Sequence, residues 1–559
     1  MQTDLGRRLE SDVLSWSGSD SPSWGELLPG SLAFRIGAAA IGAAVLGEIS
    51  RFSRARDAPR HTRSRVYAPP LFRVPAFLDI AGKAFRICGN HREEQGALVG
   101  FARKSESILR IGEEILKKAT SGAFVFLFAA LFFGQTFAAD RYIRAGATGS
   151  NNGNDWTNAF SAFPSSYTRG DTYYIASGAY PGNVAVSSGE SGSAWIQFKK
   201  ATATAHGTSA GWSDAYAKGP AVINGNLRIN SPYVDFDGVT GSGNSGHGIR
   251  ISADSCTQGG VIRVASGISH VHIRHVEVSA VFKSPSECDL FYQNNVGRSA
   301  SDIHVSNSWL HDCSRNGVTI GNHQGTGWAD SDVGFLFENN RLEKTGGSTD
   351  RDLHGQGVQA GYSSKQDYHV FRGNTFKDIV GSAIITYLDK TVNNNIRIYN
   401  NVFTSSGKPG DYWVSPAVIW IHNEGGTIAN NVGIYNNTFH NIYRAQIQIW
   451  PKGSGNESLN NLYVNNYFSA GNGGVASRNN AYFANTGGGV PRGEKGQRNE
   501  KAQPVTNAAA EDFTLVNGAR AIDSGMPVPS YFNTDIVGTP RPQGPSWDIG
   551  AYEFKRKVP

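Results

Sequence analysis

The sequence predicts an all-β protein built as a solenoid, a chain wound so that the strands of each coil stack on those of the coil before. Three observations favour this fold: a composition rich in turn-forming residues, short segments that alternate apolar and other residues, and the recurrence of these segments. The 559 residues include 67 Gly, and only 39% are apolar. Because Gly is a poor helix former, a helical bundle is disfavoured. The 29 Phe, 21 Tyr and 11 Trp argue against general disorder.

The N-terminal part of the chain differs in charge from the rest. Residues 1–119 hold 18 Lys and Arg against 13 Asp and Glu, whereas residues 120–559 hold 34 against 33. The larger part therefore has no basic excess, and we expect no nucleic-acid partner. An anionic ligand would need a local basic cleft.

An apolar run, AFVFLFAALFF, occupies residues 123–133. Two lysines precede it and the small residues Ala138 and Ala139 follow it, which is the order of segments in a secretory signal peptide. The run is shorter than the roughly 20 residues that span a bilayer; a type II membrane anchor and a buried core helix are the alternatives. We predict a signal-like segment at 116–139, a secreted, periplasmic or extracellular location, and an extension over 1–115 that is disordered or not translated.

From about residue 140 onward the chain repeats two units. The first is a short alternating segment followed by Asn and an apolar residue, and its copies end at Val278, Leu310, Leu342, Phe376, Phe403, Phe439 and Phe468. The second is another alternating segment between copies of the first, at 317–323, 357–363, 383–389, 417–423 and 446–452, with a weaker copy at 474–480. Two strand units in each irregular period suit a solenoid, and we predict one such domain over 140–559.

The stacking of coils explains the recurring Asn. Asn tolerates the left-handed backbone conformation that sharp turns need. Its side-chain amide can donate a hydrogen bond to one neighbouring coil and accept one from the other. We therefore expect a ladder of Asn side chains, with the apolar residue that follows each Asn pointing inward onto its equivalents.

The four cysteines are Cys88, Cys256, Cys288 and Cys313. They form no CxxC pair and no Cys/His spacing typical of a metal site. The last three allow one disulfide and one buried thiol, but their spacing does not assign the pair.

Both ends of the repetitive region resemble a known class. RYIRAGATGSNNGNDWTNAF (141–160) with 170–180 resembles the N-terminal cap and first coil of right-handed parallel β-helix proteins; 518–525 with 535–554 resembles a C-terminal segment common in its bacterial members. The class includes pectate, chondroitinase-like and alginate lyases. The resemblance implies a single-stranded right-handed parallel β-helix. It implies less about activity, because this architecture carries lyases, hydrolases, epimerases and non-enzymatic surface proteins.

Equivalent positions after the second unit should form a row across the coils. Aligned copies place in this row Asn322, His323, Tyr362, Ser363, Leu388, Asp389, His422, Asn423, Pro451 and Lys452, beside Tyr387, Trp420 and Trp450. Aromatic faces stack on sugar rings and cations attract carboxylates, so we predict that the substrate-binding residues are Tyr362, Tyr387, Trp420, Trp450 and Lys452. In the alternative interpretation, half of the aromatic residues belong to the core and the charges form a solvated face.

A Gly-rich loop, GGSTDRDLHGQGVQ (346–359), gathers four charged or titratable residues. Asp350 and Asp352 offer the hard oxygen ligands that Ca²⁺ prefers. Alternatively, they hold Arg351 or His354 in place, or the loop is an exposed polar turn.

Among the activities found in this class, uronate lyases remove the proton α to a carboxylate, and their base is commonly Lys or Arg, with His in some relatives. We predict a monomeric polysaccharide lyase that cleaves a uronate-containing polymer by β-elimination. Its catalytic candidates are Lys390, Arg351, His354 and His422. A glycoside hydrolase with Asp350 and Asp352 as its acid and base, an epimerase, and a non-catalytic glycan-binding surface protein are the alternatives.

Three histidines, His270, His272 and His275, lie at near-alternate positions in SHVHIRHVEV. A metal site is one interpretation of this spacing. In the other interpretation, the three histidines are outward-facing polar residues of a coil.

Overall fold

The computed structural model describes residues 138–556, except 255, 257–258, 282–286, 348–354, 362–364, 388–391, 408–416, 424–425, 529–531 and the side chain of Tyr387. The predicted extension over 1–115 therefore lies outside the described residues. So does the predicted signal-like segment at 116–139, except for residues 138 and 139. No helix in the described part of the chain is long and apolar enough to cross a membrane.

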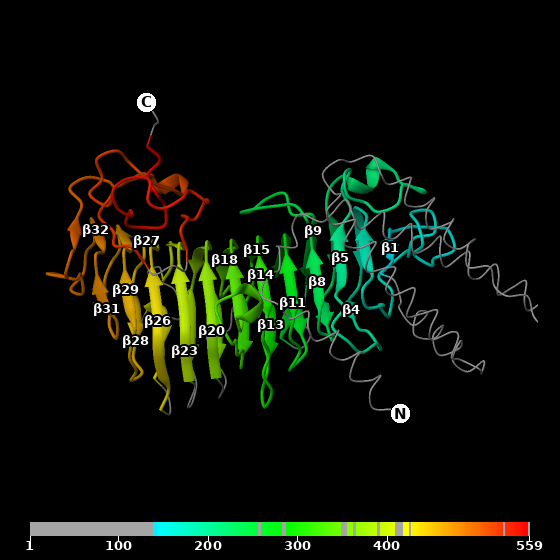
Figure 1. Cartoon of the computed structure of the whole chain (residues 1–559), viewed down its shortest axis with the longest axis horizontal. Coiled ribbons are helices and arrows are strands. Elements are labelled where there is room, and N and C mark those ends of the chain that lie inside the picture. The colour runs from blue at the N-terminus through cyan, green and yellow to red at the C-terminus, as the bar shows by residue number, and fades with distance from the viewer. Residues whose placement is uncertain are drawn as a thin grey trace, which may run out of the picture. The chain divides into compact units, whose positions relative to one another are not determined.

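The described strands form three long parallel sheets, and each coil of the chain adds strands to them in turn (Figure 1). Sheet A contains β1 (Asp140–Ile143), β2 (Thr172–Ile175), β5 (Ile196–Lys200), β8 (Val234–Asp237), β11 (Val271–Arg274), β14 (Ile303–Ser306), β17 (Phe335–Glu338), β20 (Lys365–Arg372), β23 (Val392–Tyr399), β26 (Ile428–Tyr435), β29 (Glu457–Leu459) and β31 (Ala476–Arg478).

Sheet B contains β3 (Gly178–Pro181), β6 (Ala221–Asn224), β9 (Ile249–Ala253), β12 (Val276–Ala280), β15 (Trp309–His311), β18 (Arg341–Thr345), β21 (Thr375–Ile379), β24 (Val402–Thr404), β27 (Thr438–His440), β30 (Leu462–Val464), β32 (Ala481–Phe483) and β33 (Arg498–Asn499). Sheet C contains β4 (Val184–Val186), β7 (Leu227–Ile229), β10 (Gly260–Val264), β13 (Asp289–Asn294), β16 (Val318–Gly321), β19 (Val358–Gly361), β22 (Ile384–Tyr387), β25 (Ala417–Ile421) and β28 (Ala445–Ile449). An antiparallel pair, β34 (Val505–Asn507) and β35 (Asp512–Leu515), and the short 3-10 helices η2 (Asp214–Ala217), η3 (Asp330–Asp332) and η4 (Ala508–Ala510) complete the described elements.

The predicted stacking of coils is confirmed, but each full coil carries three strands rather than two. The first sequence unit contains two strands, one in sheet A and one in sheet B, with a sharp corner between them. At one such corner β20 ends at Arg372 and β21 begins at Thr375, so that only Gly373 and Asn374 lie between the two strands. The prediction that 474–480 is a further copy of the second unit is wrong, because Ala476–Arg478 is β31 of sheet A.

The corners confirm both roles predicted for Asn. The first corner residue has a positive φ, as at Asn400 (53°) and Asn436 (49°). The second corner residue is buried and forms the ladder: the amide of Asn401 donates to Oδ1 of Asn437 at 3.0 Å, and the amide of Asn437 donates to Oδ1 of Asn461 at 3.0 Å. At each of these corners one residue thus adopts the positive φ, and the next residue forms the hydrogen-bonded ladder.

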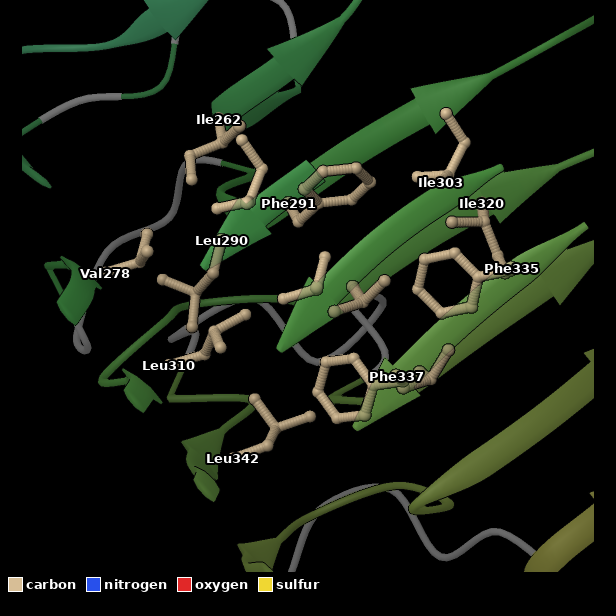
Figure 2. Close-up of a cluster of buried hydrophobic side chains, with 14 of the residues drawn as sticks. Ile262, Val278, Leu290, Phe291, Ile303, Leu310, Ile320, Phe335, Phe337 and Leu342 are labelled. Atoms are coloured by element: carbon tan, nitrogen blue, oxygen red, sulfur yellow. The ribbon is translucent and has the colours of Figure 1, made fainter. Parts of the chain in front are cut away.

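The second residue after each corner is the apolar residue that ends the first sequence unit, and it points inward and stacks in register, as predicted. The rings of Phe376, Phe403 and Phe439 follow one another at 5.0 and 4.9 Å. The next member is Tyr463, 4.9 Å from Phe439, and not the predicted Phe468. Figure 2 shows an earlier part of this interior, where Phe335 and Phe337 of β17 lie among apolar side chains of neighbouring coils.

The cysteines adopt one of the arrangements that their number allowed. Cys256 and Cys288 form a disulfide, and Cys313 is a buried free thiol. Burial raises the pKa of the Cys313 thiol well above its ordinary value, so this group is a packing residue.

The C-terminal segment packs on the outside of the corners. The side-chain amides of Asn400, Asn436 and Asn460 donate hydrogen bonds of 2.8 Å to the backbone carbonyls of Thr534, Asp548 and Met526, respectively. The corner residues that adopt positive φ therefore also anchor the end of the chain.

Candidate functional site

The outer face of sheet C carries the described part of the predicted substrate row. Side chains of a strand alternate between its two faces, and the inward ones here belong to the main core. The strand register places the alternate, outward residues in one line across the coils: Arg263, Tyr292, Thr319, Gln359, Ile385, Trp420 and Gln448.

The register corrects the alignment of one copy of the second unit by one residue. The sequence alignment set Ile384 beside Val418, whereas the structure pairs Ile384 with Ile419. His422 follows directly after β25, and its backbone N–H donates to the carbonyl of Thr386 at 2.9 Å. His422 therefore lies level with Tyr387 and Trp450, not with Leu388 and Pro451 as the aligned row had it.

The predicted residues Trp420, His422 and Trp450 come together in one cluster. Ring centroids lie 5.1 Å apart for Trp420 and Trp450, 5.3 Å for His422 and Trp450, and 4.6 Å for Trp420 and His422. Two successive coils contribute to it, with Trp420 on β25 and Trp450 directly after β28. We call these three side chains the aromatic cluster.

The two indoles of the aromatic cluster have different exposures. Trp450 is 43% exposed, and its Nε1 donates to Oε1 of Gln448 at 3.0 Å, which fixes the ring on the sheet. Trp420 is only 7% exposed and packs in a small apolar group with Ile385 and Ala445. Within the part of the chain that the structure describes, Trp420 Nε1 is buried and has no hydrogen-bond acceptor. Trp450 thus offers the open ring face, and Trp420 supports it from beneath.

Two other members of the predicted row lie elsewhere. Lys452 is exposed but has left sheet C, because its backbone forms a bridge with Ile428 at the start of β26. His323 is fully buried rather than outward-facing, and its Nε2 lies 2.8 Å from Oε1 of Gln293. The row prediction is therefore wrong for His323, since the chain turns inward after β16.

His323 meets a second buried histidine, His369, in the interior of the coils. Nε2 of His369 lies 3.2 Å from the backbone carbonyl oxygen of His323. Burial lowers the pKa of His323 well below its ordinary value and that of His369 to about 4. Both side chains are enclosed, so we interpret them as neutral structural groups.

Most of the predicted catalytic and metal-binding residues lie outside the described residues. They are Lys390, Arg351, His354, Asp350 and Asp352, and the predicted substrate-binding residue Tyr362 also lies outside. Tyr387 is described by its backbone alone, as the last residue of β22. The predictions of their roles, and of Ca²⁺, therefore stay predictions.

The copies of the second repeat unit recognised in the sequence begin at residue 317 and so leave out the upstream strands of sheet C. Arg263 on β10 and Tyr292 on β13 extend the outward line, and both are partly exposed. Their segments, GVIRV (260–264) and DLFYQN (289–294), do alternate. The alternation was the available signal, but these strands lie further upstream than the copies that were aligned.

Comparisons with known proteins yield structural neighbours only. No protein-family model matches the chain, and no curated protein matches it. Among solved structures, pectate lyase Pel9A is 14% identical with a TM-score of 0.43, covering 75% of this chain and 98% of that one. An alginate lyase from Paenibacillus sp. str. FPU-7 is 14% identical with a TM-score of 0.30, covering 59% and 92%. The A-module of the mannuronan C-5 epimerase AlgE6 from Azotobacter vinelandii is 12% identical with a TM-score of 0.22, covering 59% and 91%.

These likenesses are too low to carry an argument about activity. The fold itself follows from the order of the strands, since each sheet adds its next strand from the next coil and every pair within the three long sheets is parallel. The chain has the right-handed parallel β-helix fold.

Proposed function

We propose that this chain is an exported polysaccharide lyase that cleaves a uronate-containing polymer by β-elimination on the outer face of sheet C. The observation that carries the proposal is the aromatic cluster. Two coils place an exposed, hydrogen-bonded indole, Trp450, beside an imidazole, His422, directly after the ends of β28 and β25. A sugar ring stacked on Trp450 would lie within reach of His422.

The chemistry sets what the site must supply. In β-elimination a base removes the proton at the carbon next to the uronate carboxylate, and a double bond forms between this carbon and its neighbour. The bond from the neighbouring carbon to the glycosidic oxygen breaks, and the departing oxygen keeps the bonding electrons and takes up a proton. The negative charge that develops on the carboxylate needs a cation or a hydrogen-bond donor. His422 can exchange a proton at its ring nitrogen, and Lys390 and Arg351 remain the candidates for base and cation.

The position of β22 connects the cluster to Lys390. Tyr387 ends β22, and only two residues separate it from Lys390 in sequence. At roughly 3.3 Å for each extended residue, the backbone of Lys390 is at most about 10 Å from that of Tyr387. This distance keeps Lys390 among the candidates for the same site.

Two features support export. A signal-like run lies at 123–133, and Cys256 and Cys288 form a disulfide. Disulfides persist mainly in oxidising compartments such as the periplasm and the extracellular space.

The test uses the full chain with alginate, pectate, chondroitin and hyaluronan, each with Ca²⁺ and with a chelator. Ultraviolet absorbance reports the unsaturated product. We expect one polymer to give a rising signal, Lys390→Ala to abolish turnover while binding persists, and Trp450→Ala to weaken binding by roughly tenfold. Tyr467→Ala is the matched control, because Tyr467 is a comparably exposed aromatic residue, 47% against 43%.

Each other outcome points to a different activity. New reducing ends without an absorbance rise would indicate a hydrolase. Binding that depends on Trp450 without any product would favour the non-catalytic glycan-binding alternative, which the aromatic cluster alone also supports. Unchanged turnover in Lys390→Ala would remove Lys390 from the site.

A further inference from the structure

A cluster of histidines on the outer face of sheet A plays no part in the proposed lyase site. It lies on β11 and β14, neighbouring strands of successive coils (Figure 1). His272 and His304 are register partners, and their imidazole rings stack at 4.0 Å with an interplanar angle of 5°. Stacking of the coils thus places two parallel imidazoles side by side.

Both imidazoles direct the same nitrogen at one carboxylate. Asp302 occupies the turn before β14 with a φ of 54°, and its carboxylate is 5% exposed. Nε2 of His272 lies 2.9 Å from Oδ1 of Asp302, and Nε2 of His304 lies 3.0 Å from that same oxygen. The three candidate ligand atoms of His272, Asp302 and His304 all lie within 4.8 Å of one another.

Further polar and ring contacts surround these three residues. Nδ1 of His270 lies 2.7 Å from Oδ2 of Asp302, and the ring of His270 stacks on Tyr233 at 4.2 Å. The backbone carbonyl oxygen of Asp330 lies 2.8 Å from Nε2 of His304 and adds a fourth polar atom to the three candidate ligand atoms. A carboxylate held from behind by an imidazole is typical of the outer shell that orients metal ligands.

We propose that His272, Asp302 and His304 bind a divalent transition-metal ion, with Zn²⁺ preferred, that bridges two successive coils. Two imidazole nitrogens and a carboxylate oxygen suit Zn²⁺, whereas Ca²⁺ takes oxygen ligands. Ligand atoms in a tetrahedral zinc site lie roughly 3.3 Å apart. The Nε2–Oδ1 distances of 2.9 and 3.0 Å need to open by a few tenths of an ångström. The two Nε2 atoms lie within 4.8 Å of each other on stacked rings, so the imidazoles would tilt toward a shared ion.

The ion would act as a clamp between coils. Its ligands come from β11, from β14 and from the turn directly before β14, so they meet only when the two strands are paired. A metal that binds the folded chain alone raises its stability in proportion to the logarithm of metal concentration. The site lies on a different sheet from the proposed substrate face, so its test does not depend on lyase activity.

The test is metal binding to the untagged full chain. After exposure to chelator, the protein is equilibrated with Zn²⁺ or Co²⁺, and bound metal is counted after removal of the excess. We expect one ion per chain bound through these residues, a visible ligand-field spectrum for Co²⁺, and a higher Tm with Zn²⁺ than with chelator. His272→Ala and His304→Ala should each lose this ion, and His270→Ala should weaken binding by roughly 10–100-fold.

His275→Ala is the matched control. His275 lies directly after β11, is 23% exposed against 22% for His272, and pairs with Asp237 instead of Asp302. It should keep the ion. His272→Gln guards against a folding defect, because it retains a polar side chain yet should lose the metal, with its Tm in chelator matching that of the unmodified chain.

Three outcomes would overturn the proposal. One is an unmodified chain that retains no Zn²⁺ and no Co²⁺. Another is retention of the ion by both His272→Ala and His304→Ala. The third is loss of the ion in His275→Ala to the same extent, which would place any metal elsewhere on the strand.

Discussion

Acidification tests the interior of the coils through His369. This side chain is fully buried, with Phe335 and Phe371 around it at ring distances of 6.2 and 6.4 Å. Burial lowers its pKa from 6.5 to about 4, although a hydrogen bond to the carbonyl of His323 and the charge of Asp367 act in the opposite direction. The folded chain therefore keeps His369 neutral at a pH where an unfolded chain protonates it.

The sign of the effect follows from proton binding. Between pH 6.5 and pH 4 the unfolded chain binds a proton that the folded chain does not, so the free energy of unfolding falls as the pH falls. One pKa unit is worth about 1.4 kcal/mol, and the difference between 6.5 and about 4 amounts to roughly 3 kcal/mol in full. At about pH 4.5 the loss is roughly 2.5 kcal/mol. Burial of His323 acts in the same direction.

Urea unfolding of the full chain and of His369→Gln, at pH 7 and at about pH 4.5, measures this loss. Burial raises the pKa of carboxyls such as those of the half-buried Glu494 and the buried Glu553, and these groups titrate in both proteins and cancel in the comparison. We expect the unmodified chain to lose roughly 2.5 kcal/mol more than the variant between the two pH values. Equal losses in the two proteins would refute the argument that His369 is held neutral by burial.

Three further predictions concern the coils themselves, each measured by urea unfolding at pH 7. Phe403→Ala removes a ring stacked on both sides and should cost roughly 3–5 kcal/mol; a cost below about 1 kcal/mol would contradict the inward ladder. Asn437→Ala leaves buried partners unpaired on two neighbouring coils and should cost at least roughly 2 kcal/mol, whereas a neutral result would show that the ladder is dispensable. Replacing Cys256 and Cys288 together by Ser should cost roughly 3.5–4 kcal/mol, because the disulfide closes a loop with a sequence separation of 32; a gain in stability would contradict this expectation.

The corners of the coils were predictable because their requirements are local. A left-handed residue and a side chain that can both donate and accept are needed at each corner, and few residue types meet those needs. The apolar residue that follows is fixed by the alternation of the strand. For this reason the ladder from Phe376 through Phe439 appears in the sequence as it does in the structure.

The candidate site was predictable only in part. Trp420, His422 and Trp450 were chosen from alternation and composition, and they do meet. Their partners in the row depend on the register between coils, which the pairing of Ile384 with Ile419 shifts by one residue. A shift of this size exchanges the residues that lie level with His422.

The sequence by itself determined the coil, its Asn corners and its inward aromatic ladder, since each follows from the backbone conformation and alternation of a few consecutive residues. Only the tertiary structure decided which coils lie in register, that Tyr463 rather than Phe468 continues the ladder, and that His323 turns inward. It also brought His272 and His304 onto one carboxylate. These outcomes depend on the length of the segment between coils, and alternation within a single strand contains no information about that length.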